Sequence, residues 1–122
     1  MKDREELLKK LNEAFASCNT DFLTASVTDD VSWQIVGEKT ISGKKNFEKS
    51  LDRMRLGGPV EIKVSQIIIS DEKSVVEGIV EFQVEPGKKK KYAFCDIYVF
   101  AENDEQKFKE LRTYVAHLKK KK

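Results

Sequence analysis

The sequence is short of the residues that build most metal sites and nucleophilic catalytic sites. It has one histidine, His117, and two cysteines, Cys18 and Cys95, which stand far apart and in no metal-ligand spacing. A single histidine excludes most His-based zinc sites. The sequence contains neither a P-loop nor a Gly-x-Gly-x-x-Gly turn, so no nucleotide site is expected. We therefore expect neither a cofactor nor a metal.

Long apolar runs are absent as well, and the charges nearly cancel. No run approaches the ~20 residues of a membrane span, and the first residues, Met1 to Glu6, are charged where a secretory signal would be apolar. The formal net charge of +2 gives no reason to expect a nucleic acid or a membrane as a partner. We expect a cytoplasmic protein in which both cysteines are free, buried thiols, with a disulfide between them as the alternative.

What is present is enough apolar material for one domain. Hydrophobic residues make up 39% of the 122 residues and charged residues 36%, which predicts a single domain over residues 1–122 with a core and a strongly solvated surface. Apolar residues at helical spacing predict three helices, over residues 3–18, over residues 21–27 with Thr20 or Asp21 as the cap, and from Ser42-Gly43 to the Gly57-Gly58-Pro59 stop. Runs rich in β-branched and aromatic residues predict strands over residues 31–36, 60–70, 74–84, 92–100 and 108–118.

Helices in the first half and hairpin-linked strands in the second are the pattern of an α+β fold. We expect one antiparallel sheet with the helices packed on one of its faces, and the four lysines after Pro86-Gly87 at a solvated hairpin tip. The outer face then carries Cys95, Ile97, Val99 and Tyr114, an apolar set that needs a cover. We expect a homodimer through this outer face.

The strand over residues 92–100 carries the main indication of a site. Its side chains alternate between two apolar faces, and one of these holds Phe94, Asp96 and Tyr98 in a row. A carboxylate is costly in such surroundings unless it is paired, hydrogen-bonded or protonated. Asp96 is therefore either a ligand-contacting or acid–base carboxyl, or a structural carboxyl held by Tyr98, Trp33 or a backbone amide.

Strand alternation and the helical stripes predict the lining of a pocket around Asp96. The expected wall consists of Trp33, Ile35, Phe82, Phe94, Asp96, Tyr98, Thr113 and Val115, and the expected roof of Phe15, Phe47, Leu51 and Met54. Plain core packing is the alternative for Trp33 and Tyr98. The inner set has one carboxylate and no histidine or cysteine, which cannot hold zinc or magnesium.

The order of these elements resembles a known superfamily. The residues that carry the resemblance are Asp29-Asp30-Val31-Ser32-Trp33, Ser42-Gly43 with an apolar helix, Cys95-Asp96-Ile97-Tyr98-Val99-Phe100 and Leu111-Arg112-Thr113-Tyr114. The chain is similar to nuclear transport factor 2-like domains of the SnoaL-like and ketosteroid-isomerase-like kind. The resemblance implies a cystatin-like, cone-shaped α+β domain, with three N-terminal helices on a strongly curved, mostly antiparallel sheet around a deep pocket. It also implies a homodimer through the outer sheet face.

The resemblance can be followed residue by residue. Asp96 stands in the place of the oxyanion-binding aspartic acid of ketosteroid isomerase. Ile35 stands in the place of that enzyme's proton-abstracting carboxylate, and Leu11 near the place of its oxyanion tyrosine, so steroid isomerisation is not expected. Polyketide cyclases of this fold rely on an acid–base residue that Asp96 can supply. The Asp-Arg-Asp network of the related epoxide hydrolases is not evident, because no arginine falls on a predicted inward position.

Three functions follow from these observations. The first is a small dimeric domain that binds an apolar or aromatic small molecule, because ligand pockets are mostly apolar with a few placed polar groups. The second is a cyclase, isomerase or lyase that uses Asp96 as a general acid or base. The third is a protein-interaction module in which the cone is filled by its own side chains.

Overall fold

The computed structural model describes residues 2–71, 73–104 and 106–118. Its helices are α1 (Lys2–Ser17), α2 (Thr20–Ala25) and α3 (Lys44–Leu56). Its strands are β1 (Val27–Ile35), β2 (Lys39–Ser42), β3 (Glu61–Ile69), β4 (Lys73–Glu85), β5 (Lys88–Phe100) and β6 (Phe108–Leu118). No helix among the described residues is long and apolar enough to cross a membrane.

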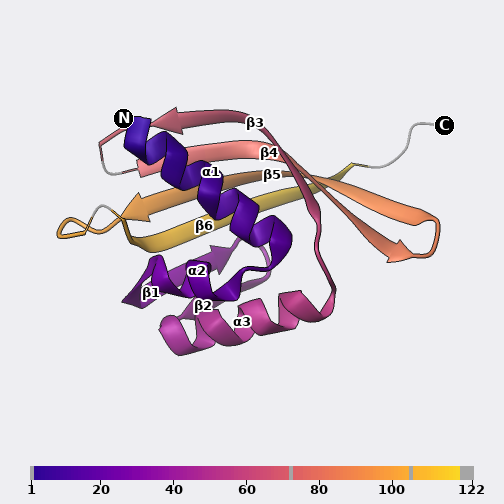
Figure 1. Ribbon diagram of the computed structural model, residues 1–122, viewed down its shortest axis with the longest axis horizontal. Coiled ribbons are helices and arrows are strands. Elements are labelled where there is room, and N and C mark those ends of the chain that lie inside the picture. Colours follow the sequence, from indigo (N-terminus) through magenta and orange to yellow (C-terminus); the bar gives the residue numbers. More distant parts are fainter. Residues whose placement is uncertain (1, 72, 105, 119–122) are drawn as a thin grey trace.

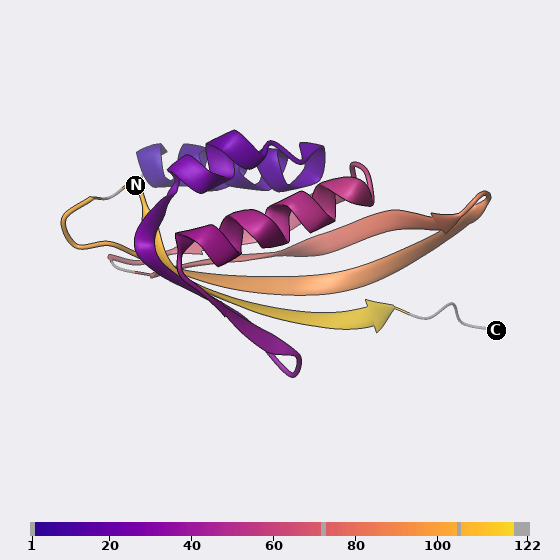
Figure 2. The same cartoon turned by 90° about the horizontal axis from the view of Figure 1, so that it is seen from below.

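The strands form one six-stranded sheet in the order β2-β1-β6-β5-β4-β3. Only β1 and β6 pair in parallel, and the other neighbours are antiparallel. The three helices lie together on one face of the sheet, and β4 and β5 reach beyond them as a long hairpin (Figures 1 and 2). The α+β fold with three helices packed on a mostly antiparallel sheet is confirmed. The strong curvature of the sheet and the cone shape stay predictions.

The structure corrects the sequence analysis at several element ends. The N-cap of α2 is Asn19, whose side chain accepts from the backbone N–H of Phe22 at 3.2 Å, and not Thr20 or Asp21. Strand β2 was not predicted, because in its four residues only Ile41 is buried and the pattern is too short to read. The lysines at 88–91 lie within β5, paired with β4, and not at a hairpin tip, because the turn needs only Pro86-Gly87.

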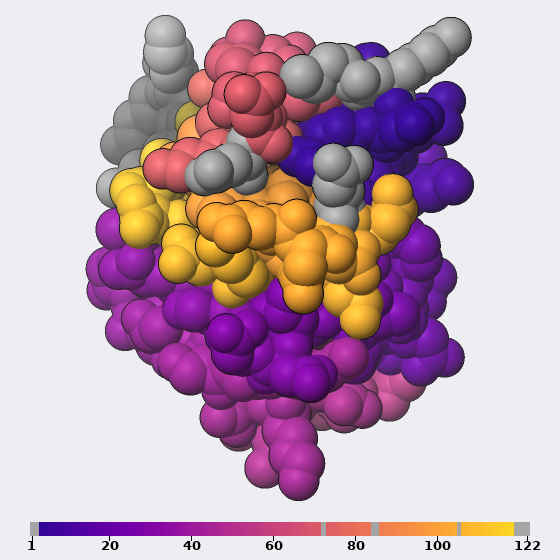
Figure 3. Space-filling model, turned by 90° about the vertical axis from the view of Figure 1, so that its left-hand side faces the viewer, coloured from indigo at the N-terminus to yellow at the C-terminus, as the bar shows by residue number. Residues whose placement is uncertain are grey.

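An aromatic cluster of the core lies at the end of the sheet where β5 leads into β6. Tyr98 and Phe108 meet edge to face with ring centroids 5.1 Å apart, and Phe47 of α3 lies 6.1 Å from Phe108. The guanidinium of Arg4 lies 3.8 Å above the ring of Phe100 at the edge of this cluster. Seen from that end, the orange β5–β6 connection lies between indigo α1 and the purple segment of β1 (Figure 3).

The sheet face away from the helices carries apolar side chains among charged ones, since Arg112 pairs with Ile97 and Glu110 with Val99. Cys95, Ile97 and Val99 are half-buried there, and the neighbouring strands add Ile79, 36% exposed, and Tyr114, 42% exposed. We call these five residues the outer patch. Both cysteines are free thiols as expected, but Cys18 and Cys95 are half-buried and not buried.

Candidate functional site

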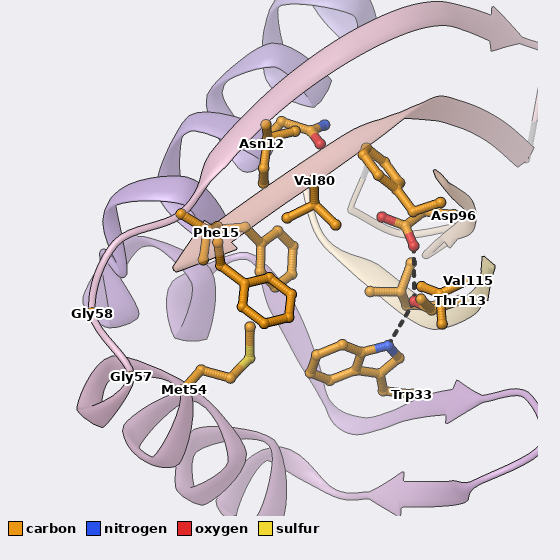
Figure 4. A pocket seen from close by; sticks show the side chains of 15 residues that line it. Asn12, Phe15, Trp33, Met54, Gly57, Gly58, Val80, Asp96, Thr113 and Val115 are labelled. Carbon is orange, nitrogen blue, oxygen red and sulfur yellow. Dashed lines mark hydrogen bonds between the residues drawn. The ribbon is translucent and has the colours of Figure 1, made fainter. Parts of the chain in front are cut away.

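A cavity of about 330 Å³ lies between the inner face of the sheet and the C-terminal ends of α1 and α3 (Figure 4). We call it the main cavity. Its lining is apolar apart from a few side chains, and consists of Asn12, Phe15, Trp33, Met54, Gly57, Gly58, Val60, Ile62, Val80, Phe82, Phe94, Asp96, Leu111, Thr113 and Val115. Asp96 is the single charged residue in this set.

Most residues that the sequence assigned to the pocket meet at the main cavity. These are Phe15, Trp33, Met54, Phe82, Phe94, Asp96, Thr113 and Val115. Their role in binding stays a prediction, but the folded chain brings their side chains together. Gly78, the partner of Phe94 on β4, lies where a Cβ would collide with the Lys63 carbonyl oxygen and crowd the Phe94 ring.

Four predicted pocket residues lie elsewhere. Three of them are buried in the core, namely Tyr98, Phe47 and Leu51. The fourth, Ile35, faces a depression beside β2. Alternation along a strand gives the face of a side chain but not its depth along the sheet. Tyr98 is on the predicted inner face, two residues beyond Asp96, and that step takes it out of the cavity and into the aromatic core.

Sequence reasoning missed the segment that joins α3 to β3, and it missed one polar residue. Gly57 and Gly58 were interpreted only as a helix stop, and Val60 only as the start of a strand, yet all three border the cavity. The backbone N–H of Val60 donates to the carbonyl of Ala16 at 2.9 Å, which holds this segment against the end of α1. The missed polar residue is Asn12, and the available signal was its place within the apolar stripe of α1.

Asn12 presents an acceptor to the cavity. Its Nδ2 donates to the carbonyl oxygen of Leu8 at 2.8 Å, while its Oδ1 has no hydrogen-bond partner among the described residues. The side chain is only 5% exposed. Leu11, where the resemblance places the isomerase tyrosine, is fully buried in the core instead. Asn12 therefore offers a polar atom from α1, on the side of the cavity away from Asp96 (Figure 4).

A chain of two hydrogen bonds crosses three neighbouring strands at the cavity wall. The indole Nε1–H of Trp33 donates to Thr113 Oγ1 at 2.9 Å, and the Thr113 hydroxyl donates to Asp96 Oδ1 at 2.8 Å (Figure 4). Thr113 faces inward as predicted, since it stands beside Ile35 on β1 and Asp96 on β5. The direct partner of Asp96 is thus Thr113, and not Tyr98, Trp33 or a backbone amide.

The Asp96 carboxyl is buried with one of its two oxygens unpartnered. Asp96 is 9% exposed, and within the described part of the chain its Oδ2 has no partner and the carboxyl has no cation beside it. Burial raises the pKa of Asp96 to about 7, against the smaller lowering effect of the hydrogen bond from Thr113. Near neutral pH the group can therefore present either a proton or a lone pair to the cavity.

The described residues include no group of three or more histidine, cysteine, aspartate or glutamate side chains placed to hold a metal ion. The expectations of no metal and no cofactor stay predictions. The chemistry present at the cavity is that of one titratable carboxyl, one amide oxygen and a hydroxyl that is already engaged.

These features define a class, a small α+β domain with an apolar cavity and one internal carboxyl. The family model of the SnoaL-like domain matches residues 8–109, and the chain belongs to this family. A comparison with curated proteins finds no match.

Several solved structures share the fold of this chain. An NTF2-like protein of unknown function from Cytophaga hutchinsonii is 22% identical, with a TM-score of 0.74 over 92% of this chain and 98% of that one. An LEH-like epoxide hydrolase from M. tuberculosis is 18% identical, with a TM-score of 0.81 over 95% and 84%. The epoxide hydrolase/cyclase-like enzyme SalBIII, which acts in pyran ring formation in the polyether salinomycin, is 13% identical, with a TM-score of 0.81 over 94% and 92%. The NTF2-like fold is thereby shown.

The buried carboxyl predicts a pH-dependent stability. Because the pKa of Asp96 is about 7 in the folded chain and about 4 when unfolded, the native protein holds an extra proton between these values. The free energy of unfolding should therefore fall by about 4 kcal/mol in total as the pH rises from below about 4 to above about 7. Asp96→Asn should remove this fall, measured by denaturant unfolding across the range.

Asp29→Asn is the matched control, because the Asp29 side chain is 99% exposed. That variant should keep the fall in stability. An equal pH dependence in the wild type and Asp96→Asn would contradict the raised pKa. Strong destabilisation by asparagine at every pH would instead assign Asp96 an ionised, structural role.

Proposed function

We propose that this protein binds an apolar or aromatic small molecule in the main cavity, with Asp96 as its central polar contact. The observation that carries the proposal is a cavity of about 330 Å³ whose apolar wall contains an unpartnered carboxyl oxygen. Ligand sites are typically of ~300 Å³ or more, mostly apolar, with a few polar groups that fix orientation. Asn12 supplies a second such group.

The main cavity disfavours the alternative function, an interaction module in which the cone is filled by its own side chains. That alternative requires the inner side chains to occupy the space between helices and sheet. Phe47, Tyr98 and Phe108 instead pack against one another outside the cavity, and the cavity is bordered by Gly57 and Gly58, which have no side chains. The described residues therefore leave room that a ligand can fill.

An enzyme is the second candidate, and the state of Asp96 favours it. A general acid or base works best when its pKa lies near the operating pH, and the pKa of Asp96 is raised to about 7. The free Oδ2 can take a proton from a bound substrate or give one to it. Since no second charged residue lines the cavity, the reactions that fit are isomerisation, cyclisation or elimination within one molecule.

The homodimer is proposed on the outer patch. Cys95, Ile97, Val99 and Tyr114 lie in neighbouring positions of β5 and β6 on the face that no helix covers. Exposed apolar patches of this kind mark interfaces, and a patch on a sheet face can meet its own copy about a two-fold axis.

Binding is tested with the neutral fluorophore N-phenyl-1-naphthylamine. Val80 lines the main cavity, whereas Ile79, the preceding residue, belongs to the outer patch. Val80→Phe should lower the affinity about tenfold or more, equivalent to ~1.4 kcal/mol, because the larger ring fills the space. Ile79→Phe should leave it unchanged. No binding by the wild type, or equal effects of the two variants, would contradict a ligand site at this cavity.

Acid–base catalysis is tested with a panel of apolar and polyketide-like substrates that cyclise, isomerise or eliminate within one molecule. Turnover should drop by roughly 100-fold in Asp96→Asn. Thr113→Val should shift the pH profile upward, because the hydrogen bond from Thr113 lowers the pKa of Asp96, and Thr113→Ser should restore it. A 5-ene-3-ketosteroid should not be isomerised. Turnover that survives Asp96→Asn would place the chemistry elsewhere.

Dimerisation is tested by sedimentation. Ile97→Lys should weaken the dimer at least 100-fold, because it buries a second cation beside Arg112, the cross-strand partner of Ile97. Gln34→Lys adds the same charge on the outer face of the sheet, on β1 and outside the outer patch, and should leave the dimer unchanged. A wild-type protein that sediments as a monomer at micromolar concentration would overturn the proposal.

A further inference from the structure

A second hollow adjoins the main cavity. It has a volume of about 230 Å³ and is formed by β1, β2 and α3. Its lining consists of Trp33, Ile35, Lys39, Ile41, Ser50, Arg53 and Met54. Two of these residues, Trp33 and Met54, also line the main cavity, so the two hollows meet there. We call this second hollow the basic depression.

The basic depression is amphipathic. Its floor is apolar, and its two charged residues, Lys39 and Arg53, are both cations. Neither forms an ion pair with another described residue. The acid nearest to Arg53 along the chain, Asp52, is engaged by Arg55 at 3.7 Å. Two exposed cations therefore face one apolar hollow without an acidic partner in the described structure.

The strands explain why Lys39 faces this side. Lys39 pairs with Ile35 across β1 and β2, two positions from the Trp33–Ile41 pair. Trp33 and Ile41 are buried on the inner face, so Lys39 stands on that face as well. Arg53 reaches the hollow from α3, one turn after Ser50. The cations thus come from two different elements and converge on one place.

We infer that the ligand of the main cavity is an amphipathic anion, with its apolar body beside Asp96 and its carboxylate, or an equivalent anionic group, in the basic depression between Lys39 and Arg53. The inference rests on the proposed binding function and adds the chemical class of the ligand. An anion inside the main cavity would be desolvated and would stand near a carboxyl that ionises around neutral pH. The basic depression offers it solvent and opposite charge.

Met54 provides the passage between the two hollows. It is 43% exposed and lies opposite Trp33 at the lower edge of the main cavity (Figure 4). A methionine side chain is unbranched and adapts to irregular apolar partners. A ligand chain can therefore run between Met54 and the Trp33 indole without breaking the hydrogen bond from Trp33 to Thr113.

Two probes that share one aromatic skeleton test this inference. N-phenyl-1-naphthylamine is neutral, and 8-anilino-1-naphthalenesulfonate carries an added sulfonate. The wild type should bind the sulfonate more tightly. The double variant Lys39→Gln/Arg53→Gln should lose about tenfold in affinity for the sulfonate and should bind the neutral probe unchanged. Lys45→Gln/Lys49→Gln removes the same net charge from exposed positions of α3 and should change neither affinity.

The pH separates the two possible positions of the anion. In the basic depression, its affinity should stay constant between about pH 6 and pH 8, whereas an anion beside Asp96 would be repelled as that carboxyl ionises. Competition by decanoate, stronger than by 1-decanol and weakened by the double variant, would extend the result to carboxylates.

The negative outcomes of these binding experiments can be distinguished from one another. If neither probe binds the wild type, the proposed function itself fails. If the neutral probe binds but the sulfonate does not bind more tightly, only the inferred anionic class fails. It also fails if Lys45→Gln/Lys49→Gln matches the effect of Lys39→Gln/Arg53→Gln, since net charge alone then explains the loss. Equal loss of both probes in Lys39→Gln/Arg53→Gln would indicate a change of shape, and would likewise overturn it.

Discussion

The cavity side of the sheet depends on how one buried carboxyl is satisfied. A single hydroxyl, that of Thr113, accepts from Trp33 and donates to Asp96. The three residues are neighbours only because β6 lies between β1 and β5, which requires the one parallel pairing in the sheet. Loss of this hydroxyl would leave an indole N–H and a carboxyl oxygen without partners together, and unpaired buried polar groups are costly.

The cavity exists because large side chains are distributed unevenly along the inner face of the sheet. At one end, Phe47, Tyr98 and Phe108 fill the space with interlocking rings. At the other end, α3 stops at Leu56 and is followed by two glycines, while β4 and β5 continue past the helices (Figure 2). The hydrogen bond from Val60 to Ala16 fixes the connection there. The sheet is thus longer than its cover, and the uncovered apolar stretch becomes the wall of a site.

The sequence predicted what depends on periodicity. Alternation placed Asp96 and Thr113 on the inner face, and helical spacing found all three helices. It could not predict depth along the sheet, so Tyr98 and Phe47 were assigned to a cavity that they do not reach. Strand β2 was missed because its one buried residue, Ile41, carries no pattern. The role of Asn12 depends on tertiary position, since only the folded chain shows that its Oδ1 faces a hollow.

The separation of charges at the site is itself informative. A cation beside Asp96 would favour its ionised form and lower its pKa, and the acid would then stay charged at neutral pH. The chain keeps Lys39 and Arg53 in a different hollow, with the Trp33 indole and Met54 where the two hollows meet. A buried carboxyl without a cation beside it lowers the free energy of unfolding as the pH rises. The stability of the fold therefore gives no reason to retain this carboxyl. Its unpartnered oxygen at a cavity wall does give one, because perturbed acids cluster where ligands bind or react.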